Sequence, residues 1–183
     1  MPRNAILRSE TPKIPSNLPE ATGKININGS SLINAPKDAV WNALLNFASY
    51  PNWNPFVRSQ LVANEFAIPL DNQISFLGAK LVIMSQIPPL PQPVHVPTPP
   101  DLLTQHITIE DITVINTENY RVAWFFLSPD WVLNTNRWSA VSTVADDDGV
   151  EKSYYESRET FNGPLESVVQ DLFGDDIAES FEA

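Results

Sequence analysis

The amino-acid sequence predicts an α+β domain in which a run of antiparallel strands lies between two helical regions. Near the N-terminus, Lys24–Asn28 alternates polar and apolar residues and predicts a strand that continues toward Ile33. The middle of the chain carries successive strand patterns joined by short turns, which is typical of an antiparallel meander. The end of the chain returns to apolar residues at helical spacing. Residues 1–22 contain prolines and little periodicity, so we expect an extended arm followed by one domain at 23–183.

Two short helices are expected directly after the first strand. Apolar residues recur at helical spacing over residues 40–47, Pro36 suits a first helical turn, and Asn34 is placed to cap it. Pro51 cannot continue this helix. The segment Tyr50–Phe56, which is hemmed in by prolines, predicts a short second helix or a turn.

The central strands are expected where the pattern of apolar and polar residues fits a sheet, at 58–63, 73–77, 80–86, 107–115, 121–127, 136–144 and 152–161. Turn-forming residues predict hairpins at 71–72, 116–119 and 146–149. A proline-rich insert at 87–101 predicts a stiff loop, because proline donates no ladder hydrogen bond. Asn162-Gly163-Pro164 then opens the last helix, whose apolar stripe comprises Leu165, Val168, Val169, Leu172, Phe173, Ile177 and Phe181.

The composition excludes several classes of function. The formal net charge is −11 with only 11 lysines and arginines, which disfavours nucleic acids and anionic membranes as partners. There is no cysteine, so thiolate catalysis and cysteine metal sites are excluded. No nucleophile elbow, phosphate-binding loop or dinucleotide fingerprint occurs, and no histidine pairing supports a metal. Without a signal peptide or membrane span in the sequence, we expect a cytoplasmic protein that uses no metal or other cofactor and does not insert stably into membranes.

Three stretches and one tryptophan carry a resemblance to a known superfamily. The stretches are Ile33-Asn34-Ala35-Pro36 leading to Val40-Trp41, Tyr50-Pro51-Asn52-Trp53-Asn54-Pro55-Phe56, and Glu159-Thr160-Phe161-Asn162-Gly163-Pro164-Leu165, together with Trp124 in a late strand. With this order of elements, the chain resembles the helix-grip (SRPBCC) superfamily of the birch pollen allergen, the START domains and the polyketide cyclases. The resemblance implies a curved antiparallel sheet of about seven strands around a long C-terminal helix, with one cavity for an apolar small molecule.

Strand parity predicts which side chains line that cavity, since alternate residues of a strand share a face. Phe161 should pack under the terminal helix, which also places Tyr155, Ser157 and Glu159 inside. Val122, Trp124 and Phe126 share one face of an earlier strand.

The strand at 136–144 is oriented by taking Trp138 as an inward residue. Asn136 then also faces inward and Arg137 faces outward. A tryptophan taken alone is better explained by core packing than by ligand contact. The predicted ligand-binding set is Trp53, Trp124, Phe126, Asn134, Asn136, Trp138, Ser157 and Phe161.

Four residues are the candidates for acid–base chemistry. A carboxylate at Glu159 in an apolar cavity should have a raised pKa and could act as general acid or base. The alternative is an ion pair of Glu159 with Arg137 or Arg58 near the cavity rim, or exposure to solvent. His106 and His95 are candidate proton shuttles, with ordinary surface positions as the alternative. Tyr155 could orient a carbonyl or phenol, although hydrogen bonding within the protein also explains such a residue.

Two main hypotheses of function follow. The first is a cofactor-independent cyclase, dehydratase or isomerase that acts on a polyketide-like or terpenoid intermediate in secondary metabolism. The second is a carrier or sensor that binds an apolar molecule without changing it. An interaction module with a filled interior is a third hypothesis, and a homodimer is compatible with each.

Overall fold

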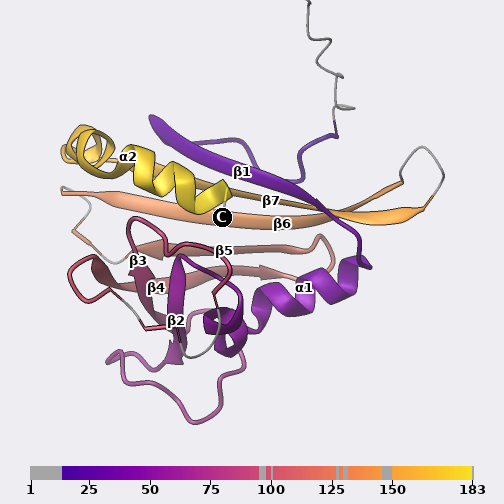
Figure 1. Cartoon of the computed structure of the whole chain (residues 1–183), viewed down its shortest axis with the longest axis horizontal. Helices are drawn as coiled ribbons and strands as arrows, with labels where there is room; N and C mark the ends of the chain where they lie inside the picture. The colour runs from indigo at the N-terminus through magenta and orange to yellow at the C-terminus, as the bar shows by residue number, and fades with distance from the viewer. Residues whose placement is uncertain are drawn as a thin grey trace, which may run out of the picture.

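The computed structural model describes residues 14–94, 98–99, 101–126, 128–129, 132–145 and 150–182. Within these residues, seven antiparallel strands form one sheet in the order β1-β7-β6-β5-β4-β3-β2 (Figure 1). The strands are β1 (Ile25–Ile33), β2 (Val57–Ala63), β3 (Lys80–Gln86), β4 (Gln105–Asn116), β5 (Arg121–Phe126), β6 (Asn134–Ala145) and β7 (Glu151–Asn162). The helices are α1 (Lys37–Leu45), the 3-10 helix η1 (Phe47–Asn52) and α2 (Glu166–Glu182). The predicted α+β helix-grip architecture is confirmed.

Helices α1 and η1 hold the apolar core at one end of the sheet. Val40, Trp41 and Leu44 are the buried residues of α1, and Phe47 of η1 packs edge-on against Trp124 at 6.1 Å between ring centroids. Pro36 itself is the N-cap of α1, and no side chain caps this helix. The predicted capping role of Asn34 is therefore wrong.

The strand predicted at 73–77 is absent, because this segment belongs to the loop that joins β2 to β3. The side chain of Gln73 folds back onto the edge strand β2, where it bonds the Val62 N–H at 2.8 Å and the Val62 carbonyl at 3.1 Å. Ile74 is 72% exposed. The alternation of residues resembled a strand, but an amide side chain occupies the hydrogen-bonding position that a partner strand would need.

Helix α2 packs against β1 and β7, at one side of the sheet (Figure 1). At its start, Gly163 has φ +111°, and a side chain there would approach the Val132 carbonyl at 2.9 Å. At its far end, α2 packs so closely on β1 that a Cβ on Gly29 would lie 2.6 Å from the Phe181 carbonyl oxygen. Between these ends, the ring of Phe173 meets His106 of β4 at 5.7 Å. The helix thus reaches from one edge strand to the middle of the sheet.

The predicted apolar stripe of α2 divides into two faces. Val169, Phe173, Ile177 and Phe181 recur every fourth residue and face the interior. The other three apolar residues of the stripe, Leu165, Val168 and Leu172, are exposed.

Residues 14–22 lie along the outer face of the sheet. The Ser16 hydroxyl and the Asn17 N–H both donate to the buried carboxylate of Glu156 on β7. Arg158 of the same strand donates to the Pro19 carbonyl. This segment therefore covers the convex side of β7, opposite the cavity.

Candidate functional site

A cavity of about 730 Å³ lies between the concave face of the sheet and the three helices. Its wall is mainly apolar, and the four inward residues of α2 form one side. The sheet and α1 contribute the others, among them Ile33, Val40, Leu44, Phe56, Val57, Ile83, Trp124, Phe126 and Phe161. This volume is in the range that holds one small organic molecule.

Strands β5 and β7 present their predicted residues to this cavity. Tyr155, Ser157, Glu159 and Phe161 of β7 all contribute to the wall, as do Trp124 and Phe126 of β5. Their catalytic and ligand-binding roles stay predictions. Trp53 lies at the rim, where it is 49% exposed and its ring lies 4.9 Å from that of Tyr50.

The predicted orientation of β6 is wrong. Arg137 lies opposite Trp124 on β5 and Glu159 on β7 in the strand register, so it shares their inward face. Trp138 lies opposite Ala123 and Arg158 on the outer face. An aromatic residue was expected to face inward, but Trp138 is partly buried on the outer face, where its neighbour Arg158 on β7 donates to the Pro19 carbonyl.

The two asparagines of the predicted ligand-binding set face outward, as Trp138 does. Asn134 and Asn136 have the same parity on β6, and neither contributes to the cavity wall. Asn136 pairs with Thr160 across the strands, and the Thr160 hydroxyl donates to the backbone carbonyl of Asn136 at 3.4 Å. The predicted proton shuttle His95 lies outside the described residues.

Glu159 meets Arg137 inside the cavity rather than at an outer rim. The Arg137 Nη1 and Glu159 Oε2 atoms lie 3.7 Å apart, and the two side chains are 16% and 17% exposed. Both side chains line the cavity. Burial raises the pKa of Glu159, while the Arg137 charge and a hydrogen bond from Thr135 act in the opposite direction. Arg137 also packs over the ring of Phe181, 4.4 Å from its centroid.

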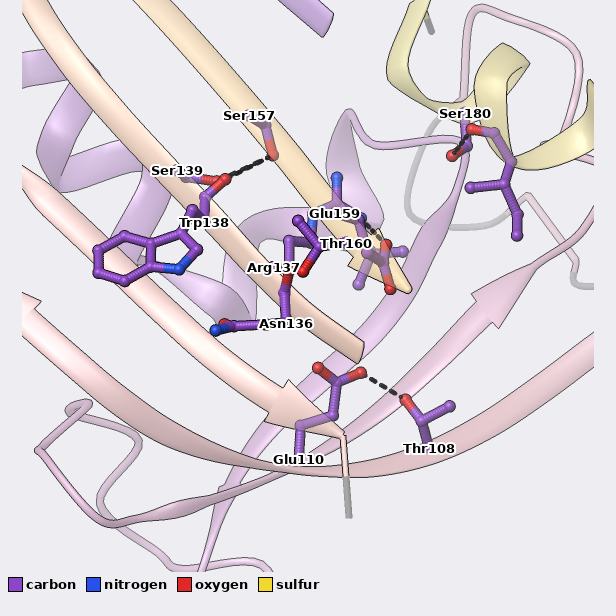
Figure 2. A network of polar contacts seen from close by, with 12 residues as sticks. Thr108, Glu110, Asn136, Arg137, Trp138, Ser139, Ser157, Glu159, Thr160 and Ser180 are labelled. Atoms are coloured by element: carbon purple, nitrogen blue, oxygen red, sulfur yellow. Dashed lines mark hydrogen bonds and ion pairs between the residues drawn. The ribbon is translucent and has the colours of Figure 1, made fainter. Parts of the chain in front are cut away.

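A second carboxylate, Glu110 of β4, lines the same cavity (Figure 2). Thr108 donates to its Oε1 at 2.9 Å. Burial raises the pKa of Glu110 to about 7 and the negative charge of Glu159 adds to the rise, whereas the Thr108 bond and Arg137 lower it. Sequence reasoning missed this residue, although parity could have found it. Placing Ile112 in the core also turns Glu110, Thr108 and His106 inward.

The remaining polar groups of the wall differ in how well they are satisfied. The Ser139 hydroxyl donates to Ser157 at 3.1 Å and lies 3.3 Å from the Tyr155 hydroxyl. Tyr50 donates to the Leu44 carbonyl at 2.6 Å, and burial raises its pKa. In contrast, Gln60 of β2 is 1% exposed, and its Nε2 finds no hydrogen-bond partner among the described residues.

The described part of the chain contains no cluster of three or more histidine, aspartate or glutamate side chains that could hold a metal ion. Among the same residues, no helix is both long and apolar enough to cross a membrane.

Comparison with solved structures identifies the fold. A START superfamily protein from Mycobacterium smegmatis matches with a TM-score of 0.51 at 10% identity, over 86% of this chain and 94% of that one. The chain has a START-like helix-grip fold. A hypothetical protein from Helicobacter pylori matches with a TM-score of 0.58 at 8% identity, over 97% of this chain and 94% of that one. The protein XoxI from Bacillus cereus matches with a TM-score of 0.51 at 15% identity, over 86% and 90%.

These identities are low, so the similarity concerns the fold alone. No family model matches the sequence, and the curated proteins contain no match to it.

Proposed function

We propose that this protein binds one small, largely apolar molecule in the cavity between the sheet and α2. The observation that carries the proposal is a volume of about 730 Å³ whose wall is built mainly from aliphatic and aromatic side chains. If these side chains served only to pack the core, they would fill this space, because protein interiors contain few voids larger than a water molecule. An apolar ligand would supply the missing contacts.

Filling the cavity tests this proposal. Val169 of α2 faces the cavity, whereas its neighbour Val168 is 46% exposed. Val169→Trp should therefore weaken binding of an apolar fluorescent dye by about tenfold or more, since an indole would occupy part of the ligand volume. Val168→Trp is the matched control and should bind the dye as the unaltered protein does. Equal dye binding by both variants would show that the dye does not use this cavity.

A second measurement identifies the natural occupant. The purified protein and the Val169→Trp variant are each analysed by native mass spectrometry, and the masses of any bound molecules are compared. A bound molecule on the former that is absent from the latter would support the proposal.

A second candidate function is acid–base catalysis on the bound molecule, and the observation favouring it is the pair of carboxyl groups in one cavity. Burial raises the pKa of both Glu110 and Glu159, so each can exchange protons nearer neutrality than an exposed carboxyl group. A base there could remove a proton from carbon next to a carbonyl, and the electron pair would move onto the carbonyl oxygen near Arg137. A cyclase, dehydratase or isomerase of polyketide-like or terpenoid intermediates could begin with such a step.

Isotope exchange separates this candidate from simple carriage. An apolar methyl ketone is incubated with the protein in deuterated water, and deuterium uptake next to its carbonyl is followed by mass spectrometry. A catalyst would accelerate uptake, and Glu110→Gln or Glu159→Gln would remove the acceleration while the ketone still bound. Uptake at the background rate with the unaltered protein would refute proton abstraction at this site.

A further inference from the structure

Gln60 combines a place in the cavity wall with a buried hydrogen-bond donor. Its side chain is almost fully buried, it contributes to the wall, and its Nε2 lacks a partner among the described residues. A buried amide donor left unpaired loses its hydration without compensation. An acceptor oxygen on the occupant of the cavity would satisfy it.

Glu110 presents the complementary group, an acceptor. The Thr108 hydroxyl bonds its Oε1, while the cationic Arg137 lies next to the other carboxylate, Glu159. The second oxygen of Glu110 is therefore the acceptor that a ligand hydroxyl could meet.

The strand register fixes how far apart these two groups lie. Gln60 lies opposite Ile83 on β3, and Ile83 lies opposite Thr108 on β4. Glu110 is the next inward position on β4. Two strand spacings and two residues along a strand place the two backbone positions on the order of 10 Å apart. A ligand could reach both groups from opposite ends of an apolar body.

The charges of the wall oppose an anionic ligand. Two carboxylates, Glu110 and Glu159, face the cavity, and Arg137 lies beside one of them. The other basic side chain of the wall, His106, packs edge-on against Phe173. A ligand carboxylate or phosphate would lose its hydration and would add a third negative charge to this space.

We infer that the occupant is an uncharged molecule with an apolar body, a carbonyl oxygen that accepts from Gln60 and a hydroxyl that donates to Glu110. The inference rests on the proposed binding function and adds that the cavity discriminates against carboxylates and phosphate esters.

Three straight-chain probes of equal length test the inference by competition with the fluorescent dye. The first carries a ketone near one end and a hydroxyl at the other, the second carries the ketone alone, and the third has a carboxylate in place of the hydroxyl. We expect the hydroxyketone to displace the dye best and the ketoacid to bind about tenfold or more weakly near pH 8. A ketoacid that competes as well as the hydroxyketone would overturn the inference.

Two variants assign the ends of the ligand. Glu110→Gln keeps an acceptor but removes the charge, so it should strengthen ketoacid binding several-fold and change hydroxyketone binding little. Gln60→Leu removes the donor and should weaken both ketone-bearing neutral probes roughly 2- to 10-fold. Unchanged affinities in Gln60→Leu would refute the ketone contact.

Stability of the empty protein provides an independent readout. Because Gln60→Leu replaces an unpaired buried donor by an apolar side chain of similar size, its thermal midpoint should equal or exceed that of the unaltered protein. A clearly lower midpoint would mean that Gln60 serves the fold.

The same assay separates failure of this inference from failure of the binding proposal. If the dye binds equally to the Val169→Trp and Val168→Trp variants, the cavity does not take it and the binding proposal fails. If the dye distinguishes those variants but the probes do not differ, the cavity binds apolar molecules without the polar selection inferred here.

Discussion

Replacing Glu110 with glutamine should stabilise the protein above neutral pH and change it less in mild acid. Burial raises the pKa of this carboxyl from the ordinary 4.5 to about 7. Below pH 4.5 the group is protonated in both the folded and the unfolded state. Between 4.5 and 7 folding takes up a proton, and above 7 the folded state contains the buried charge. The free energy of unfolding therefore decreases as the pH rises from 4.5 to 7.

The size of the effect follows from the same values. A pKa change from 4.5 to about 7 corresponds to at most about 3 kcal/mol in the free energy of unfolding. About 2 kcal/mol of this falls between pH 5.5 and pH 8. Urea denaturation at both pH values, compared between the unaltered protein and Glu110→Gln, measures it as a difference that grows with pH.

An exposed carboxylate provides the control. Glu118 lies in the turn between β4 and β5, and its replacement by glutamine should leave the pH dependence of stability unchanged. If the curves of the unaltered protein and Glu110→Gln stay parallel between these pH values, Glu110 does not carry a buried charge and the reasoning fails.

Two further changes test the ion pair and the outer segment. Arg137→Met should lower the free energy of unfolding in urea by about 3–5 kcal/mol, because it leaves Glu159 buried without its cation, and adding Glu159→Gln should restore most of the loss. Equal instability of the single and double variants would contradict this account. Glu156→Gln weakens the acceptor of Ser16 and Asn17, so amide exchange of Asn17 should become several-fold faster, whereas unchanged exchange would mean that other contacts hold the segment.

The order of elements could be predicted because periodicity and turn residues are local signals. The helical spacing over residues 40–47 and the Gly163 turn before α2 are both present in the structure. The strand expected at 73–77 failed because alternation says nothing about a partner, and the Gln73 side chain occupies the edge of β2.

The site was predicted only where an inward residue had been chosen correctly. Taking Phe161 as an inward residue gave the correct orientation of β7 and placed Glu159 in the cavity. Taking Trp138 as an inward residue gave the wrong orientation of β6, because the sequence does not reveal that the outer face next to it also carries protein contacts, such as that of Arg158 with Pro19. The alternation of inward and outward residues on β4 would also have predicted Glu110 as a residue of the cavity wall.

Hydrogen-bond satisfaction then distinguishes structural polar groups from those open to a ligand. Tyr155 was expected to orient a carbonyl or phenol and Ser157 to contact the ligand, yet both are within hydrogen-bonding distance of Ser139. Their polar atoms already have protein partners, which explains how the centre of an apolar wall can contain them. Within the described residues, the Nε2 of Gln60 has no such partner, and the Thr108 hydroxyl bonds one of the two carboxylate oxygens of Glu110. A ligand that forms hydrogen bonds with these two groups would remove the free-energy cost of leaving them unpaired in the empty protein. We therefore expect these two groups to select among ligands.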